Sequence, residues 1–162
     1  MARNLITKKH LSRQSLAGFT LLELYMVMAI VVFLAIGAFY AYLTNLKKSY
    51  DSKRKTDLYT ITQALEEYEK DNESYPASPL PACNTSTAST PLERYIGRIP
   101  CDPKTGTDYG YEVGPTVSNR VWFKAYALLE VTGDSDIAKL GCSGGCGPGG
   151  AYNFFESSPN AP

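Results

Sequence analysis

The most recognisable catalytic pattern in the chain is Gly141-Cys142-Ser143-Gly144-Gly145, which has the G-x-S-x-G form of serine hydrolases. In those enzymes the serine lies on a sharp turn between a strand and a helix and needs a histidine base nearby. The chain has one histidine, His10, and it lies in a basic segment near the N-terminus. The pattern therefore does not predict a nucleophile, and histidine metal sites and cysteine–histidine pairs are disfavoured for the same reason. We expect no enzymatic activity.

The four cysteines are the other reactive side chains, and all of them follow residue 80: Cys83, Cys101, Cys142 and Cys146. Four cysteines allow three pairings. The Ser-Gly-Gly between Cys142 and Cys146 is flexible enough to close a tight loop, and Cys83 and Cys101 would then close a proline-rich loop. The alternative is a zinc site made from all four thiolates, although the usual pair of cysteines two residues apart is missing. We expect disulfides, which form outside the cytoplasm.

A single carboxylate, that of Glu23, lies in the apolar run from Phe19 to Leu43. The run is about 25 residues long, and a bilayer-spanning helix needs roughly 20. A charged group in hydrocarbon costs about 2.5–3.5 kcal/mol on insertion scales, so such a residue usually has a function. The preceding residues 1–18 carry four basic and no acidic side chains and end in Gly18. In an ordinary secretory signal the small residue follows the apolar run, whereas here it precedes it.

The segment Gly18-Phe19-Thr20-Leu21-Leu22-Glu23, after a basic leader and before a hydrophobic helix, resembles the type IV prepilins and the pseudopilins of type II secretion. The resemblance implies that a prepilin peptidase cuts between Gly18 and Phe19 and methylates the new amine of Phe19. It also implies that Glu23 pairs with the freed Phe19 amine of a neighbouring subunit and sets the register of assembly. The alternatives are an uncleaved anchor and a Glu23 carboxylate solvated at the membrane interface.

Four segments follow from this interpretation: a leader at 1–18, a transmembrane or filament-core helix at 19–43, an amphipathic helix at 44–75 and a globular domain at 76–162. The helix is expected to continue to about Asn72, before Tyr75-Pro76. Its apolar positions make one stripe that would pack on a sheet; they are Leu46, Tyr50, Leu58, Ile61, Leu65 and Tyr68.

The C-terminal part changes to a period of two, which is typical of strands. Tyr109, Tyr111 and Val113 alternate, Val121 to Leu129 is rich in aromatic and aliphatic residues, and Ala151 to Phe155 is a third candidate. We predict an α+β, type IV pilin-like fold in which one long N-terminal helix packs on an antiparallel sheet of about three strands. A second, looser resemblance to the major pseudopilin of type II secretion and its pilin relatives covers about 40 residues: Tyr75-Pro76, then Pro100-Cys101-Asp102-Pro103 with Tyr109-Gly110-Tyr111.

In the major pseudopilins a calcium ion staples a loop between late strands, and Gly133-Asp134-Ser135-Asp136 is the acidic segment here. The Asp-x-Asp fragment does not make an EF-hand pattern, so we predict no metal and no cofactor. Residues 19–162 carry 12 basic and 16 acidic side chains, a net charge of −4, so nucleic acid is not a predicted partner.

The sequence thus predicts a subunit that is cleaved, N-methylated and polymerised into a type IV pilus or a type II secretion pseudopilus. Its partners would be copies of itself and, before assembly, membrane lipid. The family resemblance further implies the prepilin peptidase and an inner-membrane assembly platform with its ATPase. We expect a single-pass inner-membrane protein whose C-terminal domain lies outside and ends in an extracellular or periplasmic filament. The alternatives are a membrane-anchored binding module that does not polymerise, and a minor or DNA-uptake pilin.

Overall fold

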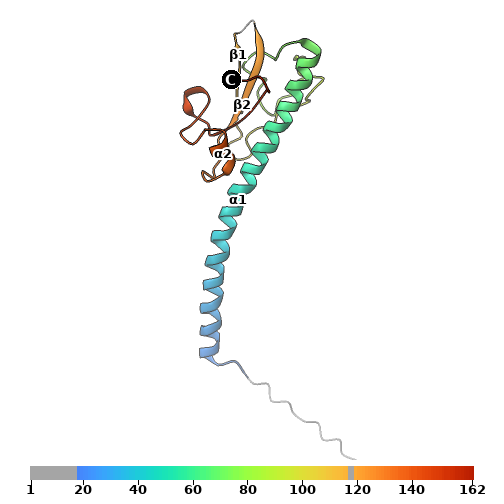
Figure 1. Ribbon diagram of the computed structural model, residues 1–162. Helices are drawn as coiled ribbons and strands as arrows, with labels where there is room; N and C mark the ends of the chain where they lie inside the picture. Colours follow the sequence, from blue (N-terminus) through green and yellow to red (C-terminus); the bar gives the residue numbers. More distant parts are fainter. Residues whose placement is uncertain (1–17, 117–118) are drawn as a thin grey trace, which may run out of the picture. The chain divides into compact units, whose positions relative to one another are not determined.

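The computed structural model describes residues 18–116 and 119–162, so the predicted leader, apart from Gly18, lies outside the described residues (Figure 1). In chain order the elements are α1 (Leu21–Asn72), β1 (Gly110–Pro115), β2 (Arg120–Ala127), α2 (Ser135–Lys139), the 3₁₀ helix η1 (Pro148–Gly150) and β3 (Phe154–Ser157). The chain divides into two compact units, and the boundary between Ala41 and Tyr42 falls within α1. The unit from Tyr42 to Pro162 contains the sheet and its core.

The three strands form one antiparallel sheet in the order β1-β2-β3. Tyr111 of β1 lies opposite Ala125 of β2, and Tyr126 of β2 lies opposite Phe155 of β3. Because successive side chains point to opposite faces, Phe123, Ala125 and Ala127 share one face, and all three are buried.

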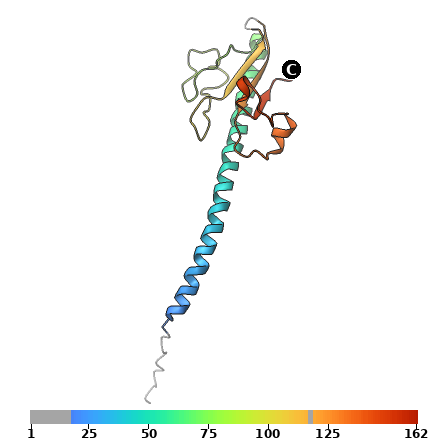
Figure 2. The same cartoon turned by 90° about the vertical axis from the view of Figure 1, so that its left-hand side faces the viewer.

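The core lies between this face of the sheet and the second part of α1, as Figures 1 and 2 show. The helix contributes Leu58, Ile61 and Leu65, which are buried together with Phe123 and Ala125 of β2. Spacings of three and four residues place these helical side chains on one side of α1. The predicted α+β arrangement of one helix on a three-stranded antiparallel sheet is therefore confirmed.

Three details differ from the sequence-based prediction. The second strand ends at Ala127, because the side chain of Asn153 donates to the carbonyl oxygen of Leu129 and accepts from its backbone N–H, at 3.0 and 2.7 Å. An asparagine side chain thus takes the place of a neighbouring strand there. The third strand begins only after Asn153 and runs from Phe154 to Ser157, three residues later than predicted.

The third difference is a short helix, α2, for which no apolar periodicity exists in the sequence. Asp134 is its N-cap, and its Oδ1 accepts from the backbone N–H of Asp136 at 2.9 Å. An aspartate cap of this kind satisfies one of the free N–H groups at a helix start. Ile137, the one buried residue of α2, joins the core.

Two disulfides hold the irregular parts of the domain. One joins Cys83 to Cys101 and the other joins Cys142 to Cys146, with Cα–Cα distances of 5.0 and 5.2 Å. All four cysteines are paired, so none of them has a free thiol that could bind zinc.

Removing the Cys83–Cys101 bond by a double Cys→Ser replacement is expected to destabilise the domain by about 3 kcal/mol, since it closes the longer loop. The loop-entropy estimate for the Cys142–Cys146 bond is only about 2 kcal/mol. Urea unfolding followed by circular dichroism measures the free energy of unfolding of each variant. An equal loss for both disulfides would contradict the loop-length argument. Because Cys142 is buried in the core, its replacement is alanine, which leaves no unpaired hydroxyl there.

Candidate functional site on the N-terminal helix

The start of α1 is fixed by Thr20. Its Oγ1 accepts from the backbone N–H of Glu23, and its carbonyl oxygen accepts from the N–H of Leu24, both at 3.2 Å. Thr20 is therefore the N-cap, and Thr20-Leu21-Leu22-Glu23 has the spacing of a capping box. Gly18 and Phe19 lie just before the helix. The cap sets where the helix begins and so keeps Glu23 in its first turn.

From Phe19 to Leu43 the large apolar side chains are exposed, between 40% for Leu43 and 85% for Phe19. The most apolar 18-residue stretch of α1 has a mean hydropathy of 2.4, and none of its residues is buried. The helix is therefore long and apolar enough to cross a membrane. Monomeric soluble proteins rarely expose a continuous apolar surface of this size. This surface needs a cover, which either lipid or other polypeptide chains can supply.

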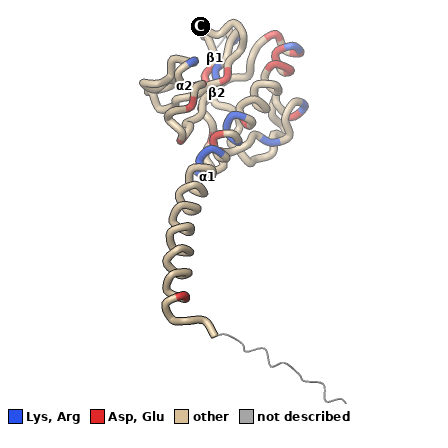
Figure 3. Tube along the Cα trace, turned by 60° about the horizontal axis from the view of Figure 1, so that its bottom comes forward, with Lys and Arg blue, Asp and Glu red and all other residues tan. Residues whose placement is uncertain are grey.

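Glu23 is the one charged side chain between Gly18 and Leu46. Figure 3 shows how sparse the charges are along the first part of α1, compared with residues 42–162. A carboxylate in the first turn interacts favourably with the helix dipole, but that interaction is too weak to compensate for burial in an apolar surrounding. Once the surface is covered, the Glu23 carboxylate requires a cation, and the first Lys or Arg along α1 is Lys47.

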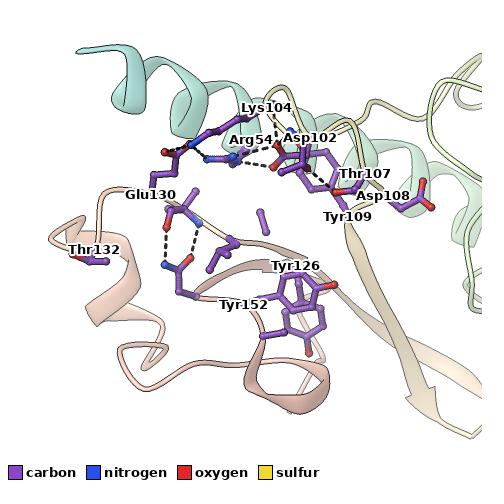
Figure 4. Close-up of a pocket in the computed structure, with 16 residues that line it drawn as sticks. Arg54, Asp102, Lys104, Thr107, Asp108, Tyr109, Tyr126, Glu130, Thr132 and Tyr152 are labelled. Atoms are coloured by element: carbon purple, nitrogen blue, oxygen red, sulfur yellow. Dashed lines mark hydrogen bonds and ion pairs between the residues drawn. The ribbon is translucent and has the colours of Figure 1, made fainter. Parts of the chain in front are cut away.

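A second group of charges lies in the domain and is centred on Arg54, whose side chain is 3% exposed. The guanidinium donates to Asp102 from Nε at 2.6 Å and from Nη2 at 3.2 Å, and Nη1 donates to Asp51 at 2.7 Å and to Glu130 at 3.3 Å. Lys104 adds an ion pair with Glu130 at 2.8 Å. Figure 4 shows the contacts of Arg54 with Asp102 and Glu130, which tie α1 to two loops.

The carboxylates of this group also receive backbone hydrogen bonds. Asp51 accepts from the N–H groups of Glu130 and Val131 at 2.8–3.1 Å. Burial alone would raise the pKa of Asp102, but the hydrogen bond from Arg54 and those from backbone N–H groups hold that pKa well below its usual range. Burial likewise opposes the charge of Arg54, yet the hydrogen bonds to Asp102 and Asp51 raise its pKa. Both groups therefore stay ionised at neutral pH.

Next to this group, Asp57 is buried and pairs with Lys53 at 2.5 Å. The hydroxyl of Tyr109 donates to the other carboxylate oxygen of Asp57 at 3.0 Å. Burial and the nearby charge of Asp57 raise the pKa of Tyr109, so its hydroxyl remains a donor.

Arg54 and its partners form one wall of an open pocket, and the stacked rings of Tyr126 and Tyr152 lie elsewhere in its lining (Figure 4). The charged side chains on this wall are engaged with one another, and Asn153 is engaged with the backbone of Leu129. Ionised side chains that hold one another in this way fit a structural role. The geometry is that of a structural clasp.

The stripe predicted from the sequence contains only apolar positions and passes over the charged residues between Tyr50 and Leu58. The buried face of α1 in fact contains Asp51 and Arg54 ahead of Leu58, at spacings of three and four residues that continue the apolar stripe. Leu46 and Tyr50, which the prediction placed at the start of the stripe, are half-buried. The signal that was available is a pair of opposite charges, Asp51 and Arg54, in register with the apolar positions.

Comparison with known proteins finds relatives that share one name. The chain is 33% identical to the type II secretion system core protein G of Escherichia coli (strain K12) over 128 residues, which are 74% of this chain and 83% of that protein. It is 36% identical to the core protein G of Vibrio cholerae over 101 residues, 58% of this chain and 68% of that protein. The match to the core protein G of Pectobacterium carotovorum, 33% over 100 residues, spans 64% of that protein. No protein-family model matches the chain, and no solved structure is significantly similar to it.

Proposed function

We propose, because this chain belongs to the family of the type II secretion system core protein G, that it is a pseudopilin, a structural subunit that polymerises into a secretion pseudopilus. The observation that carries the proposal is the continuous exposed apolar surface from Phe19 to Leu43 with a single carboxylate in its first turn. In a filament, the same segment of neighbouring copies covers that surface. The role is mechanical and involves no catalysis.

Maturation is the first step of the proposed function. The prepilin peptidase cuts between Gly18 and Phe19 and methylates the Phe19 amine, as in the family that the leader resembles. Gly18 and Phe19 precede the capped start of α1 at Thr20, so the bond to be cut lies outside the helix. An inner-membrane platform and its ATPase then drive assembly.

Glu23 sets the register of the subunits in this proposal. The cut leaves a positive amine on Phe19, and Glu23 follows it by four residues. A buried charge is stable only when it is paired, and the apolar run supplies no other cation. An amine of one copy beside the carboxylate of the next fixes their axial positions.

The orientation in the membrane follows from the segments on the two sides of the apolar run. The disulfides of residues 83–146 form in an oxidising compartment, so the domain lies outside. Residues 1–18 then face the cytoplasm, where their four basic side chains are favoured. Five basic residues also follow the span, from Lys47 to Lys55, so the charge rule alone is nearly tied and the disulfides support the orientation.

N-terminal mass spectrometry of the membrane-extracted protein tests maturation. We expect the first residue to be a methylated Phe19, because the peptidase removes residues 1–18. A protein that still begins with Met1 or Ala2 would instead be an uncleaved membrane anchor, and the proposal would fail. A Gly18→Leu variant is the control, since it removes the small residue before the cut and should leave the leader attached.

A further inference from the structure

The loop before α2 is where the family resemblance implies a calcium ion. The two aspartates of this loop, Asp134 and Asp136, face α1, and between them lies the ammonium of Lys55. Its Nζ donates to Oδ2 of Asp134 at 2.8 Å and to Oδ2 of Asp136 at 2.7 Å. One cation, supplied by the chain itself, thus bridges both carboxylates.

The other oxygens of the two carboxylates are also in use. Oδ1 of Asp134 accepts from the N–H of Asp136, and Oδ1 of Asp136 accepts from Nζ of Lys139, both at 2.9 Å. Calcium takes six to eight oxygen ligands, and here each carboxylate oxygen already holds a donor. A calcium ion bridging the two carboxylates would have to displace the ammonium of Lys55.

The remaining surroundings suit an ammonium better than a metal ion. The ring of Phe154 lies 5.3 Å from Nζ of Lys55 and presents its face to the charge, an arrangement that attracts ammonium groups and offers no oxygen ligand. Asp51, a third carboxylate in the lining of this hollow, accepts from Arg54 and from the N–H groups of Glu130 and Val131. The residues present do not fit calcium.

The charge state of the group is consistent with this geometry. Partial burial alone would lower the pKa of Lys55, but its hydrogen bonds to Asp134 and Asp136 raise it. The hydrogen bond from Lys55, and then that from Lys139, lower the pKa of Asp136 to about 2. The hydrogen bond from Lys55 also lowers the pKa of Asp134, so Lys55, Asp134 and Asp136 are charged at neutral pH.

We propose that Lys55 is the structural cation of the Asp134–Asp136 loop, so that this chain holds the loop on α1 without a divalent metal. The ammonium belongs to a residue of α1, so every copy of the chain contains it, whatever ions are in solution. This inference goes beyond the proposed function and does not depend on it.

The test is thermal unfolding of the full chain in detergent, with millimolar CaCl₂ or with EDTA. The midpoint of the unmodified protein is expected to be the same in both. Lys55→Met keeps the length of the side chain but removes its charge, and it is expected to lower the midpoint by about 3 °C or more. Lys47→Met, at an exposed lysine of the same helix, is the matched control and should leave the midpoint unchanged.

A double-mutant cycle separates a specific pair from a general loss of charge. If Lys55 holds Asp136, the combined Lys55→Met and Asp136→Asn variant loses less than the sum of the two single variants. Additive losses would overturn the proposal. So would a saturable rise of the unmodified protein's midpoint with calcium that Asp134→Asn abolishes, since calcium would then be the loop's cation.

Discussion

Replacing Glu23 by glutamine is expected to abolish filament formation while leaving the protein in the membrane. Glutamine has nearly the same shape but no charge, so the amine of Phe19 on the neighbouring copy would be buried without a partner. Losing one partner of a buried ion pair costs about 3–5 kcal/mol, which weakens each subunit contact by roughly 100-fold to 4,000-fold. Anti-subunit immunoblots of sheared filaments and electron microscopy measure the outcome.

The controls for this experiment separate assembly from folding and processing. The domain is not expected to change, because the side chain of Glu23 is exposed in the single chain. Glu67→Gln removes a carboxylate from an exposed position of the same helix and should assemble normally. N-terminal mass spectrometry should find the same methylated Phe19 in Glu23→Gln as in the unmodified chain. If Glu23→Gln forms filaments in the usual amount, the register role of Glu23 is wrong.

The anchor and the outline of the domain were predictable because they depend on local patterns. An apolar run of this length identifies a membrane segment, and a change from helical spacing to alternation, as at Tyr109, Tyr111 and Val113, identifies strands. The fold class followed from these elements. The cap at Thr20 was also readable, since the T-x-x-E spacing lies within the quoted leader motif.

The charge clusters were not predictable in the same way, because they depend on partners far apart in the chain. Arg54 is separated from Asp102 by 48 residues and from Glu130 by 76. A search for apolar periodicity skips charged residues, and charges after a membrane span are usually solvated. The structure places Lys55 against Asp134 and Asp136, and that pairing requires knowing where the loop before α2 returns to α1.

The start of β3 was missed for a related reason. The segment from Ala151 has the composition of a strand, but Tyr152 exchanges backbone hydrogen bonds with Cys146, at 2.7 and 3.1 Å. This pair and the Cys142–Cys146 disulfide together close a small loop of their own, and the strand begins only after that loop, at Phe154. Strand propensity gives no information about such competing local pairs.

Replacing Arg54 by methionine is expected to give the largest loss of domain stability, about 3–5 kcal/mol, because it leaves Asp51, Asp102 and Glu130 without their shared cation. Methionine fills much of the space of the arginine stem, so the loss reports the charge. Thermal unfolding of the full chain should show a midpoint lower by about 10 °C. Arg94→Met, at an exposed position, is the matched control and should behave as the unmodified chain does.

The pH dependence of stability gives a second test of the ion pairs of Arg54. The pKa of Asp102 in the folded chain lies below its unfolded value, so its contribution to stability is complete above about pH 4 and is lost as the pH falls through the folded pKa. In Arg54→Met the buried carboxylates lack a cation and take up protons more readily, which relieves their repulsion. The stability difference between the unmodified chain and Arg54→Met should therefore narrow in acid. A difference that stays constant with pH would mean that Arg54 acts only by filling space.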